Sequence, residues 1–176
     1  MNRVLISLSF CLTLFLVSCS KDQVASGYIS VDGEKRLELK CGYEADMSGI
    51  GMGKHNWHLF ENVVEAGSES KIAQYAVTVW SASSEPRLSS LIFSDIPGYG
   101  YLYLEFSGTG TSTVTGRYAE IGGQGKDISG TARVNTFSYN SSSTYLRLDV
   151  TFFLDKTIRL VFKGPTPNDG LKWMVD

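Results

Sequence analysis

The segment Tyr145–Leu154, which reads YLRLDVTFFL, decides the fold class of this chain. Successive side chains of a β-strand point to opposite faces, so a period of two predicts a strand with one buried and one solvated face. Apolar residues occupy every second position of this segment, at Leu146, Leu148, Val150, Phe152 and Leu154. The chain is therefore expected to contain half-buried strands, as in antiparallel sheets.

Two neighbouring regions extend the pattern. Ile158–Phe162 alternates in the same way and follows the two residues Asp155-Lys156, which predicts an antiparallel hairpin. Near the N-terminus, Arg36–Cys41 alternates basic or acidic residues with apolar ones. It follows Val31-Asp32-Gly33-Glu34, where Asp-Gly favours the positive φ angles of a type I′ turn. These features predict a second hairpin at the start of the domain.

The middle of the chain supplies further strand candidates. Turn-forming clusters of Gly, Ser, Asn and Thr separate them, and the candidates are Ile72–Ser81, Arg87–Phe93, Tyr99–Phe106, Ser112–Ile121 and Ile128–Val134. Many short strands with regular turns are typical of an antiparallel β-sandwich or β-barrel, here of about 8–10 strands. One short helix is expected at Asn56–Gly67, with Asn56 as its cap and Gly67 as its end. The fold class is therefore all-β.

The N-terminal residues have the pattern of a secretory signal. Met1-Asn2-Arg3 carries a positive charge, Val4–Val17 is mostly apolar, and the small residue Ser18 follows. The apolar run is shorter than the about 20 residues needed to cross a bilayer as a helix. We expect residues 1–18 to be removed as a signal peptide.

Leu16-Val17-Ser18-Cys19 resembles the lipobox of bacterial lipoproteins. The resemblance implies that Cys19 is acylated and becomes the first residue of the mature chain, anchoring it to the membrane. Residues 19–27 would then form the lipidated Cys and tether, and residues 28–176 a single all-β domain. Ser20, in place of the Asp that signals inner-membrane retention, is consistent with the outer membrane, and Lys21-Asp22 resembles the start of surface-exposed lipoproteins of the Bacteroidota. Periplasmic and surface-exposed locations both remain open.

A second resemblance concerns the domain itself. Ile128–Val134 and Tyr145–Gly164 are similar to the closing strands of small uncharacterised all-β lipoproteins of the Bacteroidota outer membrane. This resemblance implies a cell-envelope location and a sandwich or barrel. It transfers no catalytic residues.

Charge and cysteine content narrow the function. Arg3 is the only charged residue within residues 1–18. Removal of this segment therefore leaves 15 basic and 18 acidic residues and a near-neutral mature chain. Such a chain lacks the basic field of a nucleic-acid-binding protein, so no nucleic-acid partner is expected. Of the three cysteines, Cys11 lies in the signal and Cys19 in the lipobox. The remaining Cys41 is in phase with Leu37 and Leu39 and is expected to be a buried structural residue.

Catalytic and metal motifs are weak. The best metal candidates are His55, His58 and Glu61, because in a helix His58 and Glu61 share one face and His55 lies just before it. The spacing lacks the His-Glu-x-x-His pattern of a metalloprotease helix, and no Gly-x-Ser-x-Gly motif is present. We therefore predict no metal, no cofactor and no enzymatic activity.

Aromatic residues suggest binding. Tyr99, Tyr101 and Tyr103 alternate with Gly100, Leu102 and Leu104, which predicts three exposed rings on one strand face. Such a face is suited to stacking sugars or docking a protein. Trp80, at the end of an apolar strand, is expected in the core, whereas Trp57 is a candidate to line a ligand mouth.

Three functions follow from these observations. The preferred one is a membrane-anchored, non-catalytic module of the bacterial envelope that binds a glycan or an envelope protein. The first alternative is a lipocalin-like carrier that holds a small hydrophobic ligand inside a barrel. The second alternative is an enzyme or an enzyme inhibitor.

Overall fold

The computed structural model describes residues 25–50, 53–61, 77–81, 85–107, 112–119 and 123–167. The predicted signal segment 1–18 and Cys19 lie outside these residues. The described part contains eleven β-strands and one short 3₁₀ turn, Ser48–Ile50. The strands are β1 (Ser26–Val31), β2 (Glu34–Leu39), β3 (Cys41–Ala45), β4 (His55–Phe60), β5 (Val77–Ser81), β6 (Ser90–Ile96), β7 (Gly100–Phe106), β8 (Thr113–Ala119), β9 (Lys126–Asn140), β10 (Tyr145–Phe153) and β11 (Thr157–Pro165).

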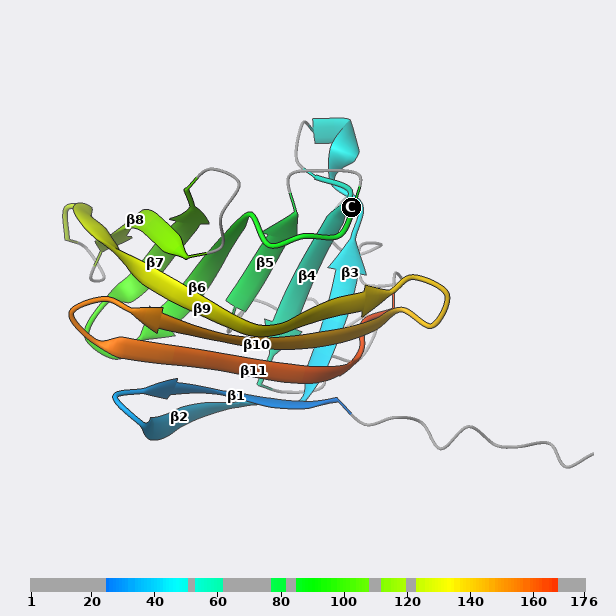
Figure 1. Ribbon diagram of the computed structural model, residues 1–176, viewed down its shortest axis with the longest axis horizontal. Coiled ribbons are helices and arrows are strands. Elements are labelled where there is room, and N and C mark those ends of the chain that lie inside the picture. Colours follow the sequence, from blue (N-terminus) through cyan, green and yellow to red (C-terminus); the bar gives the residue numbers. More distant parts are fainter. Residues whose placement is uncertain are drawn as a thin grey trace, which may run out of the picture.

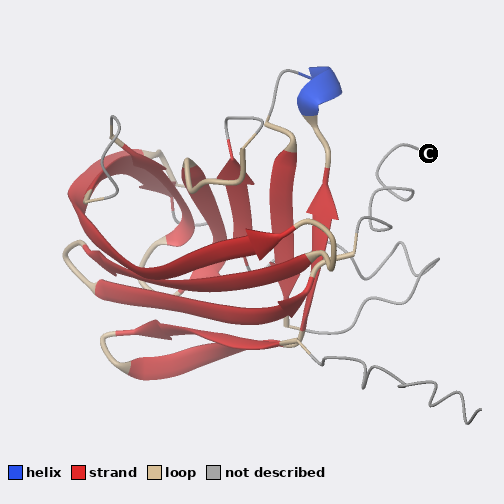
Figure 2. Ribbon diagram, turned by 45° about the vertical axis from the view of Figure 1, so that its right-hand side comes forward, coloured by secondary structure: helices blue, strands red, loops and turns tan. Residues whose placement is uncertain are grey.

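All eleven strands belong to one antiparallel sheet, in the order β2-β1-β11-β10-β9-β8-β7-β6-β5-β4-β3. The sheet curls into a flattened, nearly closed barrel, with β9, β10, β11, β1 and β2 in one wall and β3 to β8 in the other (Figures 1 and 2). The backbone N–H of Glu44 in β3 donates to the carbonyl of Pro167, just after β11, at 3.2 Å. This bond joins β3, the edge strand of one wall, to the residues that follow β11 in the other wall. The all-β prediction is confirmed, in its barrel form.

The long strand β9 turns the sheet from one wall to the other. Residues Lys126–Thr131 pair with β8, and residues Thr131–Asn140 pair with β10. The sequence predicted a strand only at Ile128–Val134, because the polar residues that follow alternate weakly. The second half of β9 therefore depends on its partner β10 more than on its own hydrophobic pattern.

Large apolar side chains fill the barrel between its walls. Leu146, Leu148, Val150 and Phe152 are at most 1% exposed, as the period of two in β10 predicted. Rings from opposite walls touch: Phe93 of β6 and Phe152 of β10 have ring centroids 5.9 Å apart and nearly perpendicular planes. Such edge-to-face contacts add to the stability that burial of the rings provides.

The two predicted turns have the expected form. Asp32 and Gly33 both have positive φ angles, 52° and 81°, as a type I′ turn requires. In the β10–β11 hairpin, Phe153 pairs with Thr157, so the connection has one residue more than the expected two-residue gap.

The helix expected at Asn56–Gly67 is wrong where the structure describes it. Residues His55–Phe60 form β4, which pairs with β3 on one side and with β5 on the other. Trp57 and Leu59 point into the barrel. Asn56 and His58, which alternate with them along the strand, are buried on the opposite face. Burial on both faces removes the alternation that marks a strand, and the pairing decides the conformation.

Cys41 is not the buried residue that its alternation with Leu37 and Leu39 predicted. β2 ends at Leu39, and Lys40 forms the corner before β3. Cys41 pairs with Phe60 on the outward face of β4, while Leu39 is buried inside the barrel. The thiol is half-buried. The corner at Lys40 breaks the phase on which the prediction depended.

Candidate functional site

The outward face of β5, β6, β7 and β8 carries the predicted tyrosine platform in part. Tyr101 is 47% exposed and Tyr103 is half-buried, while the intervening Leu102 and Leu104 are fully buried inside the barrel. The alternation predicted for these four residues is confirmed.

The third tyrosine, Tyr99, is not on this face. Gly98 and Gly100 have positive φ angles of 92° and 64°, so the chain turns sharply on both sides of Tyr99 and β7 begins only after it. The turn directs the Tyr99 side chain inward, where it is fully buried. The prediction of a three-ring ladder is therefore wrong at its first position.

Tyr99 instead packs against the tip of the β10–β11 hairpin. Its hydroxyl donates a hydrogen bond to Asp155 and accepts one from the backbone N–H of Lys156 at 3.1 Å. Its ring meets Tyr118 edge-on, with the centroids 5.2 Å apart. Burial, reinforced by the Asp155 carboxylate, raises the pKa of the Tyr99 hydroxyl, which thus stays protonated as a donor.

Trp80 joins the exposed tyrosines, although the sequence indicated a core position. The register Trp80–Ser90–Glu105 places it in the outward row of β5, β6 and β7. Its ring centroid lies 6.4 Å from that of Tyr103, with the planes tilted by 56°. The outward face therefore carries three neighbouring aromatic side chains, Tyr101, Tyr103 and Trp80, which we call the aromatic face.

A hollow of about 500 Å³ adjoins Tyr103 on the aromatic face. The Tyr103 hydroxyl donates to Glu105 at 3.2 Å, and Arg117 Nε lies 3.1 Å from Asp127 Oδ1. The hollow is lined by Tyr103, Glu105, Thr115, Gly116, Arg117, Asp127, Ile128 and Ser129. Burial, reinforced by Glu105, raises the pKa of the Tyr103 hydroxyl, so this group remains a hydrogen-bond donor. One ring, a guanidinium and two carboxylates thus surround one surface depression.

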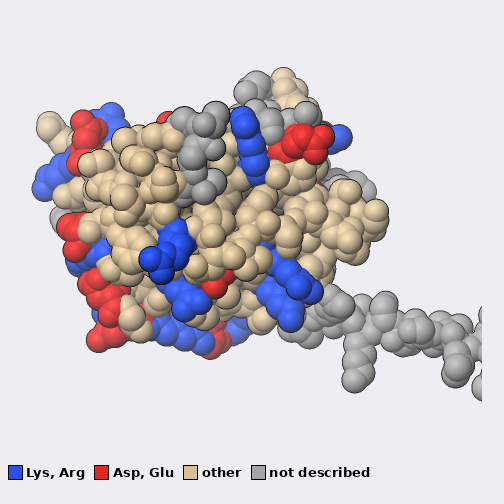
Figure 3. Space-filling view, in the orientation of Figure 1, with Lys and Arg blue, Asp and Glu red and all other residues tan. Residues whose placement is uncertain are grey.

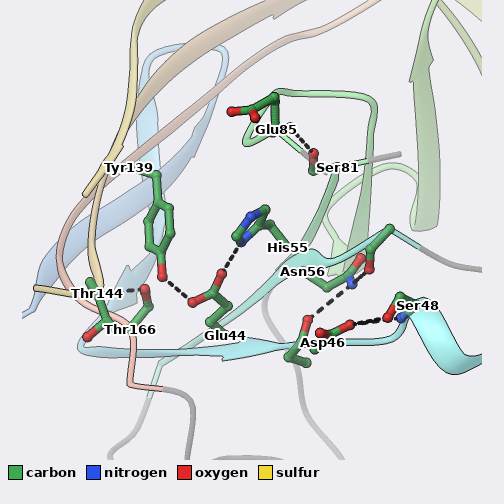
Figure 4. Close-up of polar contacts among 12 residues, drawn as sticks. Glu44, Asp46, Ser48, His55, Asn56, Ser81, Glu85, Tyr139, Thr144 and Thr166 are labelled. Carbon is green, nitrogen blue, oxygen red and sulfur yellow. Dashed lines mark hydrogen bonds and ion pairs between the residues drawn. The ribbon is translucent and has the colours of Figure 1, made fainter. Parts of the chain in front are cut away.

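A second polar cluster lies inside the barrel (Figure 4). The hydroxyl of Tyr139 in β9 donates to Glu44 Oε2, and His55 Nδ1 contacts Glu44 Oε1. Glu44 is only 5% exposed, and burial together with Glu44 raises the pKa of the Tyr139 hydroxyl. Sequence reasoning did not identify Glu44 or Tyr139, because only the pairing of β3 with β4 and the crossing of β9 bring them together.

Trp57 belongs to this interior cluster. Its ring stacks on His55 at 6.0 Å between centroids and contacts Tyr139 at 5.2 Å and Phe137 at 5.6 Å. The side chain is fully buried, and its indole N–H has no hydrogen-bond partner within the described part of the chain. Trp57 therefore does not line an open ligand mouth, because the rings of β9 cover it from the opposite wall.

The candidate metal residues are not brought together. A spacing of three in a strand places His55 and His58 on opposite faces. His55 points inward to Glu44, whereas His58 Nδ1 lies 3.2 Å from Thr78 Oγ1, and burial lowers the His58 pKa to about 4. Glu61 follows the end of β4 and is exposed. Within the described ranges, no three His, Cys, Asp or Glu residues are placed to hold a metal ion.

The interior cluster has a structural role. Glu44 accepts hydrogen bonds from two side chains on β4 and β9, and its backbone N–H bonds to Pro167. The Glu44 carboxylate therefore connects β3 to its neighbour β4 and to β9 in the opposite wall. Both of its oxygens have hydrogen-bond partners within the fold. The aromatic face, whose charged groups are exposed to solvent, is the better candidate for binding.

Comparisons with protein-family models, curated protein sequences and solved structures give no significant match to this chain. In the part that the structure describes, no helix has the length and apolar character needed to span a bilayer.

Proposed function

We propose that this chain is a lipid-anchored, non-catalytic glycan-binding module of the bacterial cell envelope, which binds its ligand on the aromatic face. The observation that carries the proposal is the arrangement of Tyr101, Tyr103 and Trp80 beside a hollow lined by Arg117 and two carboxylates. Rings and charged hydrogen-bonding groups meet there on one rigid sheet.

This combination suits the chemistry of sugars. The C–H faces of a sugar ring pack on the apolar faces of Tyr and Trp. The hydroxyls around the ring donate to carboxylates such as Glu105 and Asp127 and accept from a guanidinium such as Arg117, and bonds to charged groups are the stronger ones. The hollow of about 500 Å³ lies in the range of roughly 300–1,000 Å³ typical of small-molecule sites.

The N-terminal sequence supports the location. In this proposal residues 1–18 are removed, Cys19 is acylated, and the segment between Cys19 and β1 tethers the domain to the outer membrane; Ser26 and Gly27, expected in the tether, belong to β1. Two or three acyl chains provide stable attachment, since each buried CH₂ contributes about 0.8 kcal/mol. Because β1 begins at Ser26, only a short segment separates the lipid from the barrel.

The carrier alternative is less favoured because the described interior is packed. Phe93 and Phe152 touch across the barrel, and Trp57 contacts Phe137 from the opposite wall. A hydrophobic ligand would have to displace these rings, whereas the aromatic face accepts a ligand without rearrangement.

The proposal is tested with residues 20–176, which contain every described strand and strand pairing. The protein is screened on an array of bacterial and host glycans, and hits are measured by calorimetry. We expect Tyr103→Ala and Arg117→Gln each to weaken binding about tenfold or more, as loss of one stacking or charged contact predicts. Tyr28→Ala, a half-buried tyrosine on the opposite wall, is the control. Absence of any glycan ligand, or equal weakening by the control, would overturn the proposal.

A further inference from the structure

The outward face of the opposite wall is basic. On β10, β11, β1 and the second half of β9, the outward positions carry four basic residues and only one acidic residue within the described chain. These residues are Arg133, Arg147, Arg159, Lys163 and Asp149. The chain as a whole has more acidic than basic residues, 18 against 16. The positive charge is therefore concentrated on this wall.

The single outward carboxylate on these four strands is already occupied. Asp149 accepts two hydrogen bonds from Arg159, at 2.9 and 3.1 Å, and one from Asn135 at 3.1 Å. The Arg159 guanidinium accordingly lowers the pKa of Asp149. This pair is neutral overall and leaves Arg133, Arg147 and Lys163 without a compensating charge.

Two of the uncompensated residues are direct cross-strand neighbours. Arg147 of β10 is opposite Lys163 of β11, with Ser138 of β9 on one side and Ser26 of β1 on the other. All four side chains are exposed, and neither Arg147 nor Lys163 has an ion-pair partner in the described part of the chain. We call these four residues the cationic row. Like charges directly opposite each other destabilise a sheet, so the row is unfavourable without an anion.

The row lies where the domain begins. Ser26 is the first residue of β1 (Figure 1), and one patch of basic side chains lies at the same end of this face, with other basic side chains toward its middle (Figure 3). Five residues separate Cys19 from Ala25, so the six Cα–Cα steps between them span at most about 22 Å when fully extended. A lipid on Cys19 would therefore hold the cationic row within a short distance of the membrane surface.

We propose that the cationic row docks on the anionic phospholipid headgroups of the membrane that holds Cys19. This inference rests on the lipid anchor of the proposed function and adds the orientation of the domain to it. Arg147 and Lys163 contact phosphate oxygens, the guanidinium as a planar fork and the ammonium as a point charge. Ser26 and Ser138 supply hydroxyl donors to the same phosphates. The aromatic face on the other wall is then directed away from the membrane, toward its glycan.

The test uses residues 20–176, which lack the lipid, so that binding depends on the protein surface alone. Flotation with vesicles of phosphatidylcholine is compared with flotation with vesicles that also contain phosphatidylglycerol, at low ionic strength. We expect binding only to the anionic vesicles, and a loss of about 30-fold in the double variant Arg147→Gln/Lys163→Gln, as removal of two surface cations predicts. The control Arg87→Gln/Lys126→Gln removes the same charge elsewhere and is expected to change binding less than about twofold.

Equal losses in the two double variants would overturn the proposal, since binding would then depend on net charge alone. Binding to neutral vesicles, or none to anionic ones, would also overturn it. Glycan binding by Arg147→Gln/Lys163→Gln is measured in parallel, because the aromatic face is on the other wall. Loss of vesicle binding with intact glycan binding supports the docking surface, whereas failure of glycan binding in the unmodified chain contradicts only the proposed ligand.

Discussion

The hydroxyl of Tyr139 donates a hydrogen bond to the carboxylate of Glu44 inside the barrel, although 95 positions separate the two residues in sequence. The same carboxylate contacts His55, and the backbone of Glu44 bonds to Pro167. A buried carboxylate is stable only when its oxygens are hydrogen-bonded. Closure of the barrel and hydrogen bonding of the Glu44 carboxylate are therefore coupled, because the strands that close the barrel also supply the hydrogen-bond partners of this carboxylate.

We expect removal of this bond to destabilise the fold. Tyr139→Phe deletes the hydroxyl and leaves one Glu44 oxygen unsatisfied, which should lower the free energy of unfolding by about 1–3 kcal/mol. Urea denaturation monitored by tryptophan fluorescence measures the change. Tyr145→Phe is the matched control, because the hydroxyl of Tyr145 makes no hydrogen bond within the described part of the chain. A change below about 0.5 kcal/mol in Tyr139→Phe would contradict the structural role of the cluster.

Stability should fall in mild acid because of His58. Burial lowers the His58 pKa to about 4, so the folded state holds this imidazole neutral, while the unfolded chain takes up a proton near pH 6.5. Below pH 6.5 the unfolded state binds more protons, and the contribution of His58 to stability is lost as the pH falls from about 6.5 to about 4. The full loss is of the order of 3 kcal/mol.

The variant His58→Gln isolates this effect, because the carboxylates titrate in both proteins. The free energy of unfolding is measured by urea denaturation at intervals from pH 7.5 down to pH 4. We expect the variant to lose less stability than the unmodified chain over this interval, whatever its stability at pH 7.5. Parallel pH profiles would show that His58 is not held neutral by burial.

Tyr99 and Tyr101 should respond in opposite ways to truncation. Tyr99 is fully buried against Tyr118 and bonds to Asp155, so Tyr99→Ala should cost about 3–5 kcal/mol of stability. Tyr101 is 47% exposed, and Tyr101→Ala should change stability by less than about 1 kcal/mol. Thermal denaturation of the two variants distinguishes a ring that closes one end of the barrel from a ring on the aromatic face. Similar melting temperatures would contradict this assignment.

The strands with one solvent-exposed face could be predicted from the sequence, because their alternation of apolar and polar residues is a local property. β10 and β11 follow the pattern of Leu146 to Phe152 and Ile158 to Phe162, and the Asp32-Gly33 turn follows from its two residues. β4 could not be predicted in this way, because both of its faces are buried and the alternation is absent. Strand order and barrel closure depend on pairings between distant segments, which no local pattern encodes.

The candidate site could be predicted only in part, because some of its residues follow a local pattern and the others are brought together by strand pairing. Tyr101 and Tyr103 were found because they alternate with two leucines of one strand. Tyr99 was misplaced because the positive φ angles of Gly98 and Gly100 shift the start of β7. Trp80, Arg117 and Asp127 come from three other strands, and only the sheet order brings them to Tyr103.

The aromatic face also depends on a glycine that leaves no room for a side chain. A Cβ at Gly116 would lie 1.9 Å from the carbonyl oxygen of Tyr103, a backbone atom that cannot move without disturbing the pairing of β7 with β8. We expect Gly116→Ala to destabilise the fold by about 1–3 kcal/mol, as forced overpacking does, and to weaken glycan binding because Tyr103 shifts. Gly49→Ala is the control, since its Cβ would meet no atom within 4 Å. Urea denaturation and calorimetry of both variants test the coupling, and unchanged stability in Gly116→Ala would show that β8 does not approach β7 this closely.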